Sequence, residues 1–298
     1  MITAAEVEAA NAAALRTAAR AGIRIRELSE LTELTSMTGL FDTIWAPGPG
    51  GGSQLRPDLL RALTKAGSYA VGAYDVATGQ LIGACMGFFG PPAEAALHSH
   101  VAGVLPAGLG RAVGHALKVH QRAWCLRQGV TTVHWTFDPL IRRNAYFNLV
   151  KLGARPTEYL PDFYGDMNDS INGSGESDRM LIHWDLRSDL SVAACEGRLA
   201  PASGPAELAR GALVALDMGA GGEPVAGALQ AGPERRGGVA LVRVPADVEE
   251  LRGSDPALAV AWQQALRAAL APLMDKGGRV TGFDRDGWYV VSMGSAER

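Results

Sequence analysis

Apolar residues recur every three or four positions in several segments of the chain, and this spacing predicts amphipathic helices. The first segment, residues 4–21, is rich in alanine and ends before Gly22, a residue type that is common just after a helix. Ser29–Trp45 has the same period, and Pro57 stands at the start of the next segment, Arg56–Ala66. The spacing predicts further helices over residues 111–127, 142–152 and 257–274.

Runs of β-branched, aromatic and alternating apolar residues predict strands between these helices. Tyr69–Asp75 and Leu81–Phe89 flank the turn sequence Ala-Thr-Gly-Gln, which predicts a hairpin. A short strand is expected at Ile23 and Ile25, and others are expected over residues 97–104, 131–137, 157–164, 180–186, 213–216, 239–244, 279–283 and 288–293. The pattern therefore predicts an α/β protein.

The local composition changes after Leu186. The segment Ser188–Glu207 is rich in alanine, serine, proline and glycine, which predicts a linker without regular structure. We therefore expect an N-terminal helix over residues 1–21, a main domain over 22–187, a linker over 188–207 and a small α/β domain over 208–298.

Charge and cysteine content exclude several classes of protein. The net charge is −3 and the sequence has no basic stripe, which argues against nucleic-acid binding. Cys85, Cys125 and Cys195 are few and odd in number, which indicates a reducing compartment without a disulfide framework. The N-terminus is acidic rather than signal-like, and no apolar run approaches 18 residues. We expect a cytoplasmic protein that does not bind membranes.

One segment points to a class of ligand. Between Val101 and Lys118 an extended run breaks at Pro106 and turns through glycines into a helix. A helix N-terminus presents backbone N–H groups without intrahelical partners, and the helix dipole favours negative charge there. The amides of Leu105 and of Gly110–Gly114 are therefore predicted to bind a pyrophosphate.

The order of elements over residues 22–187 resembles that of the GCN5-related N-acetyltransferases. In that family a strand ends at V-x-P, and a Q/R-x-x-G-x-G/A bend follows. Val104-Leu105-Pro106 matches the first motif, and Leu109–Gly114 occupies the second, with Leu109 in place of Gln or Arg and Ala112 in place of the first glycine. The Leu152-Gly153-Ala154 turn adds to the match. The resemblance implies a mixed central sheet flanked by helices, with the C-terminal α/β domain as an addition.

A narrower resemblance, to a branch of predicted bacterial acetyltransferases, rests on short runs such as Ser-His-Val-Ala-Gly-Val from Ser99 and Trp-Thr-Phe-Asp-Pro-Leu from Trp135. The family resemblance implies acetyl-CoA, or another acyl-CoA, as cosubstrate. Its cofactor-binding positions fall on Val104, Leu105, Leu109, Gly110, Arg111, Ala112, Val113, Gly114, Asn144 and Phe147. The side chain of Arg111 could pair with a phosphate. Lys118, Arg122 and Arg127 are instead expected to form a solvated face of the helix.

Two histidines are the candidates for a general base. Alternate residues of a strand share a face, so His98, His100, Ala102 and Val104 are expected to point the same way. The histidines precede Leu109 by 11 and 9 residues, and the sequence is similar at both spacings to the arylalkylamine acetyltransferases. An imidazole is a suitable base near neutral pH. Two alternatives stay open: structural histidines, and a metal pair that lacks a third nearby ligand. We therefore predict no metal.

The general acid is missing from its usual place. The family has a tyrosine four residues before the glycine of its L-G-F motif, and Leu149 occupies that position here. Tyr146, Tyr159 and Tyr164 are the available substitutes, of which Tyr164 is the chosen candidate. Each could instead be a packing residue.

These features together predict an acyl-CoA-dependent N-acyltransferase that acts on a small amine or amino acid through direct attack on the thioester. Acidic residues in the loop Gly165–Asp178, among them Asp166 and Asp169, could attract a cationic amine or could be solvated surface charges. The alternative is a degenerate member that binds CoA or a protein partner without turnover. An unrelated phosphate-binding module is a third hypothesis, and a homodimer stays open.

Overall fold

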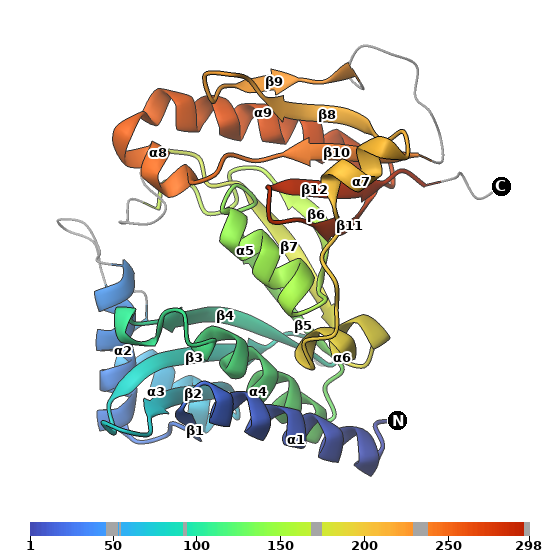
Figure 1. Cartoon of the computed structure of the whole chain (residues 1–298). Helices are drawn as coiled ribbons and strands as arrows, with labels where there is room; N and C mark the ends of the chain where they lie inside the picture. The colour runs from blue at the N-terminus through green and yellow to red at the C-terminus, as the bar shows by residue number, and fades with distance from the viewer. Residues whose placement is uncertain (46–52, 54, 92–93, 168–174, 229–237, 295–298) are drawn as a thin grey trace. The chain divides into compact units, whose positions relative to one another are not determined.

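The computed structural model describes residues 1–45, 53, 55–91, 94–167, 175–228 and 238–294 (Figure 1). These residues form two compact units. The first contains Met1–Trp135 and Trp184–Glu196, and the second contains Thr136–Met167 with the described parts of residues 175–183 and 197–294. The boundary passes through strands β5 (Thr132–Phe137) and β7 (Arg179–Asp185). It therefore differs from the predicted boundary at residues 187–207.

The first unit contains most of a mixed sheet and the helices that cover it. Its elements are α1 (Ala4–Arg20), β1 (Ile23–Glu27), α2 (Leu31–Trp45), α3 (Pro57–Lys65), β2 (Tyr69–Asp75), β3 (Leu81–Phe89), β4 (Ala96–Val104), the 3₁₀ turn η2 (Pro106–Gly108), α4 (Val113–Arg127) and α6 (Asp189–Cys195). The predicted hairpin is confirmed, because β2 and β3 pair antiparallel and Asp75 accepts hydrogen bonds from the turn amides of Ala77 and Thr78.

The strand order of the mixed sheet is β1-β2-β3-β4-β5-β7-β6, where β6 is Arg155–Leu160. β1 to β4 pair antiparallel, whereas β4 and β5 pair parallel. The predicted mixed sheet flanked by helices is therefore confirmed.

Helices cover both faces of the sheet in the first unit. A side chain at Gly83 would meet Val113 and Leu117 of α4, while one at Gly103 would meet Ile44 and Trp45 of α2. Because Gly83 pairs with Val104, the neighbour of Gly103, the two glycines face opposite sides. α1 packs along α4, as Figure 1 shows. The buried apolar core under α2 and α3 includes Leu34, Met37, Phe41, Leu60 and Met86.

The second unit contains a smaller sheet with strand order β11-β12-β10-β8-β9. Its elements are α5 (Arg142–Tyr146), the π-helical turn η3 (Phe147–Lys151), β6, α7 (Gly204–Ala209), β8 (Leu213–Met218), β9 (Pro224–Ala226), β10 (Val239–Arg243), α8 (Val248–Ser254), α9 (Pro256–Asp275), β11 (Arg279–Phe283) and β12 (Trp288–Ser292). α9 buries Trp262, Leu266 and Leu270, as its apolar spacing predicts. The predicted second α/β region is confirmed.

The segment predicted to be an irregular linker contains α6 and the start of α7 instead. Ser188 and Ser203 accept hydrogen bonds from the backbone amides of Ser191 and Ala206, so each serine caps a helix N-terminus. None of the helices formed by the described residues has the length and hydrophobicity needed to cross a bilayer.

Candidate functional site

The bend between β4 and α4 has two residues in the left-handed backbone region. Gly110 has φ +75°, and Ala112, the residue before α4, has φ +61°. A glycine adopts this conformation freely, whereas the Cβ of an alanine makes it costly by about 1–2 kcal/mol. The sequence pattern allowed for Ala112 as a helical residue, and its left-handed conformation is a correction. The turn directs the amides that follow it outward at the start of a 15-residue helix.

The amides of the bend divide into two groups. Leu105 donates to the carbonyl of Ile82 (2.8 Å), Leu109 to that of Pro106 (3.1 Å) and Arg111 to that of Gly108 (3.4 Å). Their amides are therefore engaged, which corrects the prediction for Leu105 and Arg111. No backbone carbonyl of the described residues accepts a hydrogen bond from the remaining four amides, those of Gly110, Ala112, Val113 and Gly114.

The four unengaged amides form a site that suits an anion. Gly110 and Ala112 are exposed, and a side chain at Gly110 would meet no atom within 4 Å, so the space beside the bend is open. N–H groups at a helix N-terminus, together with the helix dipole, favour a phosphate group there. The binding of a pyrophosphate at these amides stays a prediction.

The side chain of Arg111 points to protein groups. Its guanidinium pairs with Asp75 (Nη1–Oδ2 2.6 Å) and donates to the carbonyls of Ala21 (3.0 Å) and Gly22 (3.3 Å). The hydrogen bond from Arg111 lowers the pKa of the Asp75 carboxyl below its usual value. Arg111 thus ties the bend to the start of β1 and the end of β2, and this engagement corrects the expectation of a phosphate partner.

β4 has an open edge beside the bend. It pairs with β5 only over Ala96–His98, while its pairing with β3 continues to Val104. In an antiparallel ladder alternate residues bond to the partner strand, and the Leu105 amide points to β3. The backbone of Val104 therefore faces the open edge, where an extended pantetheine arm could pair as an additional strand.

A β-bulge lies at one of the two candidate bases. Met86 of β3 pairs with Val101 and Gly87 pairs with Ser99, so His100 between them has no partner on β3. The bulge interrupts the alternation that the sequence predicts.

The faces of β4 reverse across this bulge. His98 pairs with Phe88, which packs with Val101 against the core under α2 and α3. Val104 instead lies beside Gly108 and Gly114, on the α4 face. The prediction that both histidines share one face with Ala102 and Val104 is therefore wrong, because one extra residue shifts the period of two.

The two imidazoles nevertheless lie together. The ring centroids of His98 and His100 are 6.1 Å apart, and the Phe88 ring lies 5.0 Å from the first and 5.8 Å from the second. Burial, followed by the nearby charges of His100, His134 and Lys118, lowers the pKa of His98 to about 4. Burial also lowers the pKa of His100. Both rings are therefore neutral at pH 7, the state in which an imidazole can accept a proton.

Tyr164, Asn144 and Phe147 belong to the second unit. Tyr164 is 44% exposed, and its hydroxyl is 2.9 Å from that of Thr136. Asn144 and Phe147 are half-buried on α5 and η3. Leu149 is 1% exposed on the π-helical turn, so the family's acid position holds a buried side chain without a proton to donate. The roles of these residues stay predictions.

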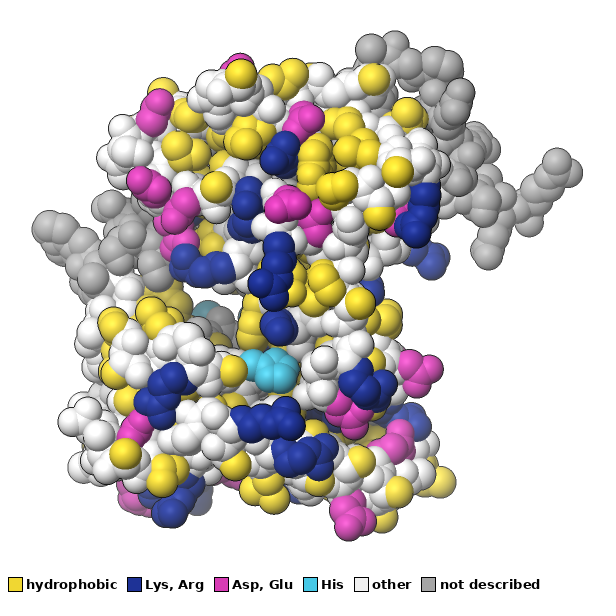
Figure 2. All heavy atoms as spheres, in the orientation of Figure 1, with side chains coloured by type: hydrophobic (Ala, Val, Ile, Leu, Met, Phe, Trp, Pro, Cys, Tyr) yellow, Lys and Arg dark blue, Asp and Glu magenta, His cyan; other side chains and the backbone are white. Residues whose placement is uncertain are grey.

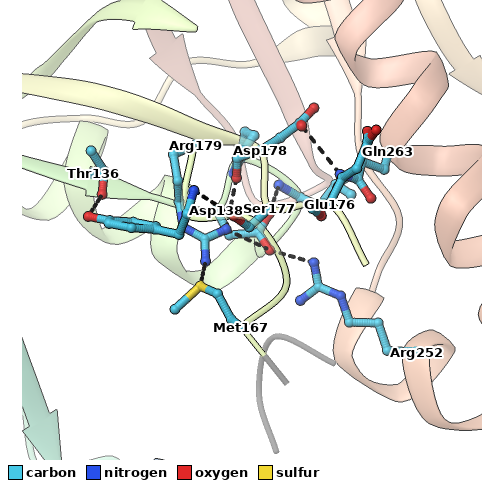
Figure 3. Close-up of polar contacts among 12 residues, drawn as sticks. Thr136, Asp138, Met167, Glu176, Ser177, Asp178, Arg179, Arg252 and Gln263 are labelled. Atoms are coloured by element: carbon cyan, nitrogen blue, oxygen red, sulfur yellow. Dashed lines mark hydrogen bonds and ion pairs between the residues drawn. The ribbon is translucent and has the colours of Figure 1, made fainter. Parts of the chain in front are cut away.

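A buried ionic network next to Tyr164 is a feature that the sequence pattern did not identify in full (Figure 3). Asp138 pairs with Arg252 (2.5 Å) and lies 4.0 Å from Arg179, whose guanidinium also lies 5.5 Å from the Tyr164 ring. All but Arg252 and Tyr164 are at least nine-tenths buried. Arg179 and Arg252 therefore lie near the same buried carboxylate, that of Asp138.

Asp178, the last residue of the predicted acidic loop, is buried rather than solvated. Its carboxylate accepts hydrogen bonds from Tyr159 (2.7 Å), Gln263 and Arg267. Burial alone would raise its pKa, but the hydrogen bonds from Arg267, Tyr159 and the Asp162 amide, together with the charge of Arg267, lower it below the usual value. Asp178 is therefore a structural anchor, and Asp169 lies outside the described residues.

The predicted solvated face of α4 is wrong for two of its three residues. Lys118 and Arg122 are 4% and 6% exposed, and Arg122 donates to the carbonyl of Leu186 (2.7 Å). The periodic pattern misses this burial because the partners come from distant strands. Figure 2 shows lysine and arginine side chains interspersed with aspartate and glutamate on the face drawn. Within the described part of the chain, no three His, Cys, Asp or Glu side chains are grouped to hold a metal ion.

No protein-family model matches the sequence, and no curated protein matches it. The structure is similar to an N-acetyltransferase from Staphylococcus aureus, 13% identical, with a TM-score of 0.46 over 55% of this chain and 99% of that one. A phosphinothricin acetyltransferase of the GNAT superfamily from Sinorhizobium meliloti, in complex with AcCoA, is 14% identical, with a TM-score of 0.44 over 54% of this chain and 87% of its own.

A GCN5-related N-acetyltransferase from Kribbella flavida is 19% identical, with a TM-score of 0.42 over 55% of this chain and 98% of its own. Each of these similarities covers little more than half of this chain. Sequence identities of 13–19% do not show which ligand this chain binds.

Proposed function

We propose that this chain is an acyl-CoA-dependent N-acyltransferase, with acetyl as the default acyl group and a small amine or amino acid as acceptor. The observation that carries the proposal is the row of four unengaged amides, Gly110, Ala112, Val113 and Gly114, beside the open edge of β4. The amides would bind the pyrophosphate of the CoA ester, and the open edge of β4 at Val104 would pair with its pantetheine arm. We assign the activity to residues 22–187.

The reaction needs a base that is neutral before the amine attacks. The acceptor nitrogen forms a bond to the thioester carbonyl carbon, and the carbon–sulfur bond breaks. We propose that His100, the bulged residue, takes the proton that the amine loses, directly or through a water, with His98 as its neighbour. The departing thiolate takes up a proton, for which Tyr164 is the candidate donor.

One observation favours the alternative, a protein that binds CoA without turnover. Leu149, at the family's acid position, is fully buried and cannot donate a proton. A thiolate can also leave without an acid, so turnover and binding must be measured separately.

Binding is tested by melting the protein with acetyl-CoA, free CoA, ATP and NAD. A ligand at about 100 times its dissociation constant adds about 2.7 kcal/mol and raises the melting temperature. We expect a shift with CoA species only, and its loss in Gly110→Glu, which places an anion at the bend. Gly129→Glu is the matched control, because Gly129 also has a positive φ and open surroundings at the other end of α4. A full shift in Gly110→Glu would move the cofactor site away from the bend.

Turnover is tested by thiol release from acetyl-CoA with a panel of amines. Removal of a general base typically costs 10²–10⁴-fold, so we expect His100→Ala to lose at least about 100-fold in kcat while CoA affinity changes by a few fold. CoA binding without thiol release in the unmodified protein would establish the alternative, and unchanged turnover in His100→Ala would refute the base assignment.

A further inference from the structure

Lys118 is a buried lysine that the proposed reaction does not use. Its side chain is 4% exposed on α4, and Nζ donates to Ser99 Oγ (3.0 Å) and to Gln121 Oε1 (2.6 Å). The ammonium lies 3.9 Å from the ring centroid of Trp135 and 5.5 Å from that of Trp184. The two indoles meet edge to face at 5.8 Å, so the nitrogen is enclosed by two hydrogen-bond acceptors and two aromatic rings.

The charge of this lysine is not matched by a carboxylate. No Asp or Glu of the described residues forms an ion pair with Lys118, and burial lowers its pKa to about 8. At pH 7 the group is therefore still mainly an ammonium. Burying an unpaired ammonium costs several kcal/mol, which cation–π contacts and hydrogen bonds offset only in part. A methionine would fill the same space without that cost, so packing alone does not account for the lysine.

The acceptor Ser99 joins Lys118 to the candidate base. Ser99 lies between His98 and His100, directly before the bulge, and its side chain faces α4 while the side chain of His98 faces the α2 side. The hydroxyl of Ser99 is also 3.9 Å from Cys85 Sγ, which accepts a hydrogen bond from Gln121 (3.6 Å). The serine is therefore held on the far side of the sheet by a closed polar cluster.

We propose that Lys118 is a positioning residue for the two imidazoles: its ammonium anchors Ser99, which lies between them in the chain, from the opposite face of the sheet. The anchor fixes the bulge that presents His100. The same charge also disfavours protonation of His98, and its contribution is smaller than those of burial, His100 and His134. The inference rests on the proposed function in treating the imidazoles as the base, but its test requires no turnover.

Four other titratable groups act on Lys118 or His98: Cys85, Cys125, His100 and His134. Cys85 of β3 and Cys125 of α4 are the titratable groups that act on Lys118, and burial raises the pKa of both thiols, so they are neutral below pH 8. His100 and His134 act on His98 in the same direction as Lys118. Lys118 stays charged while His98 titrates, so removal of its charge is visible in the titration of His98.

The charge is tested by NMR titration of the imidazoles in Lys118→Met, with resonances assigned through His98→Gln and His100→Gln. We expect the pKa of His98 to rise by about a few tenths of a unit, because the smallest of the four contributions that lower it is lost. The pKa of His100, which is lowered by burial alone, should change much less. Lys65→Met, the same change at an exposed position of α3, is the control and should move neither. An unchanged His98 in Lys118→Met would overturn the electrostatic role.

The anchor is tested by amide hydrogen exchange at His100 and Val101 in Ser99→Ala, which keeps the ammonium. We expect exchange there to accelerate about tenfold or more relative to the unmodified protein, with the pKa of His98 close to its original value. Unchanged exchange would overturn the anchoring role. Lys118→Met could fail to fold, which its circular dichroism spectrum would reveal. In that case the titration of His98 and the amide exchange at His100 and Val101 are measured in Ser99→Ala and in Lys118→Arg, which retains the charge. A turnover failure in the unmodified protein would refute the proposed function alone.

Discussion

His120, a partly buried residue of α4, links the stability of the first unit to pH. Nδ1 of His120 on α4 is 3.0 Å from the hydroxyl of Tyr69, which is itself fully buried. Burial, with a smaller contribution from Arg127, lowers the pKa of His120 from 6.5 to about 4. Between these two values the unfolded chain binds a proton that the folded chain does not. The contribution to stability is therefore complete above pH 6.5 and is lost as the pH falls toward 4.

We expect the free energy of unfolding to fall by about 1–2 kcal/mol between pH 7 and pH 5 because of His120. His120→Asn can keep a hydrogen bond to Tyr69 but does not titrate, so its decrease over this interval should be smaller by that amount. Urea denaturation of both proteins at the two pH values measures the difference. His98 titrates in both proteins, so its effect cancels in the comparison. Equal decreases in the free energy of unfolding would show that His120 is protonated as readily in the folded protein as in the unfolded chain.

At the scale of elements, Asp178 joins the start of β7 to α9 and β6. It accepts hydrogen bonds from Arg267 on α9 and from Tyr159 on β6, and it is buried. Removal of one partner of a buried ion pair leaves the other partner's charge uncompensated. Exposed pairs contribute little, because water screens both charges.

Asp178→Asn should therefore lower the free energy of unfolding by about 2–3 kcal/mol, somewhat less than a fully buried pair would because Arg267 is 29% exposed. Glu176→Gln is the matched control: Glu176 pairs with the same Arg267 but is 58% exposed, so the cost should be below about 0.5 kcal/mol. Urea denaturation distinguishes the two. Equal costs would contradict the assignment of Asp178 as the anchor.

The elements differ in how far the sequence determines them. Tyr69–Asp75, Leu81–Phe89 and Arg279–Phe283 are strands with the predicted bounds, because turn residues or apolar alternation mark their ends. The sequence pattern does not predict α6 and α8, because both helices are short and consist largely of small and polar residues. Their formation depends on serine and aspartate caps and on packing, which a periodic pattern does not reveal.

The sequence likewise predicts only part of the candidate site. The bend itself is visible in the sequence as Val-x-Pro followed by glycines, because those residue types restrict the local backbone. The bulge at His100 depends on the register with β3, and the burial of Lys118 depends on Trp135 and Trp184, which come from other strands. Such contacts are set by tertiary packing, so composition and spacing alone predict a solvated lysine where the protein encloses one.

At the scale of the whole molecule, the question is whether residues 208–298 fold as a separate domain. The second unit contains them together with β6, α5 and η3. Tyr289 donates a hydrogen bond to the carbonyl of Pro139 (2.7 Å), Arg252 pairs with buried Asp138, and Arg267 pairs with buried Asp178. A chain that ends after residue 207 would therefore expose apolar surface of β6 and η3 and leave two buried carboxylates without these partners.

We expect residues 1–207 to lose cooperative melting of the second-unit elements and to bind a hydrophobic dye, because uncompensated buried charge and exposed apolar surface both destabilise a compact state. A chain that ends at residue 294 is the control for a shortened C-terminus. Circular dichroism melts and dye fluorescence of the two truncated chains and the full chain provide the measurement. Cooperative melting of residues 1–207 within a few degrees of the full chain would instead support the predicted domain boundary. The C-terminal sheet would then be an addition that residues 1–207 do not need for folding.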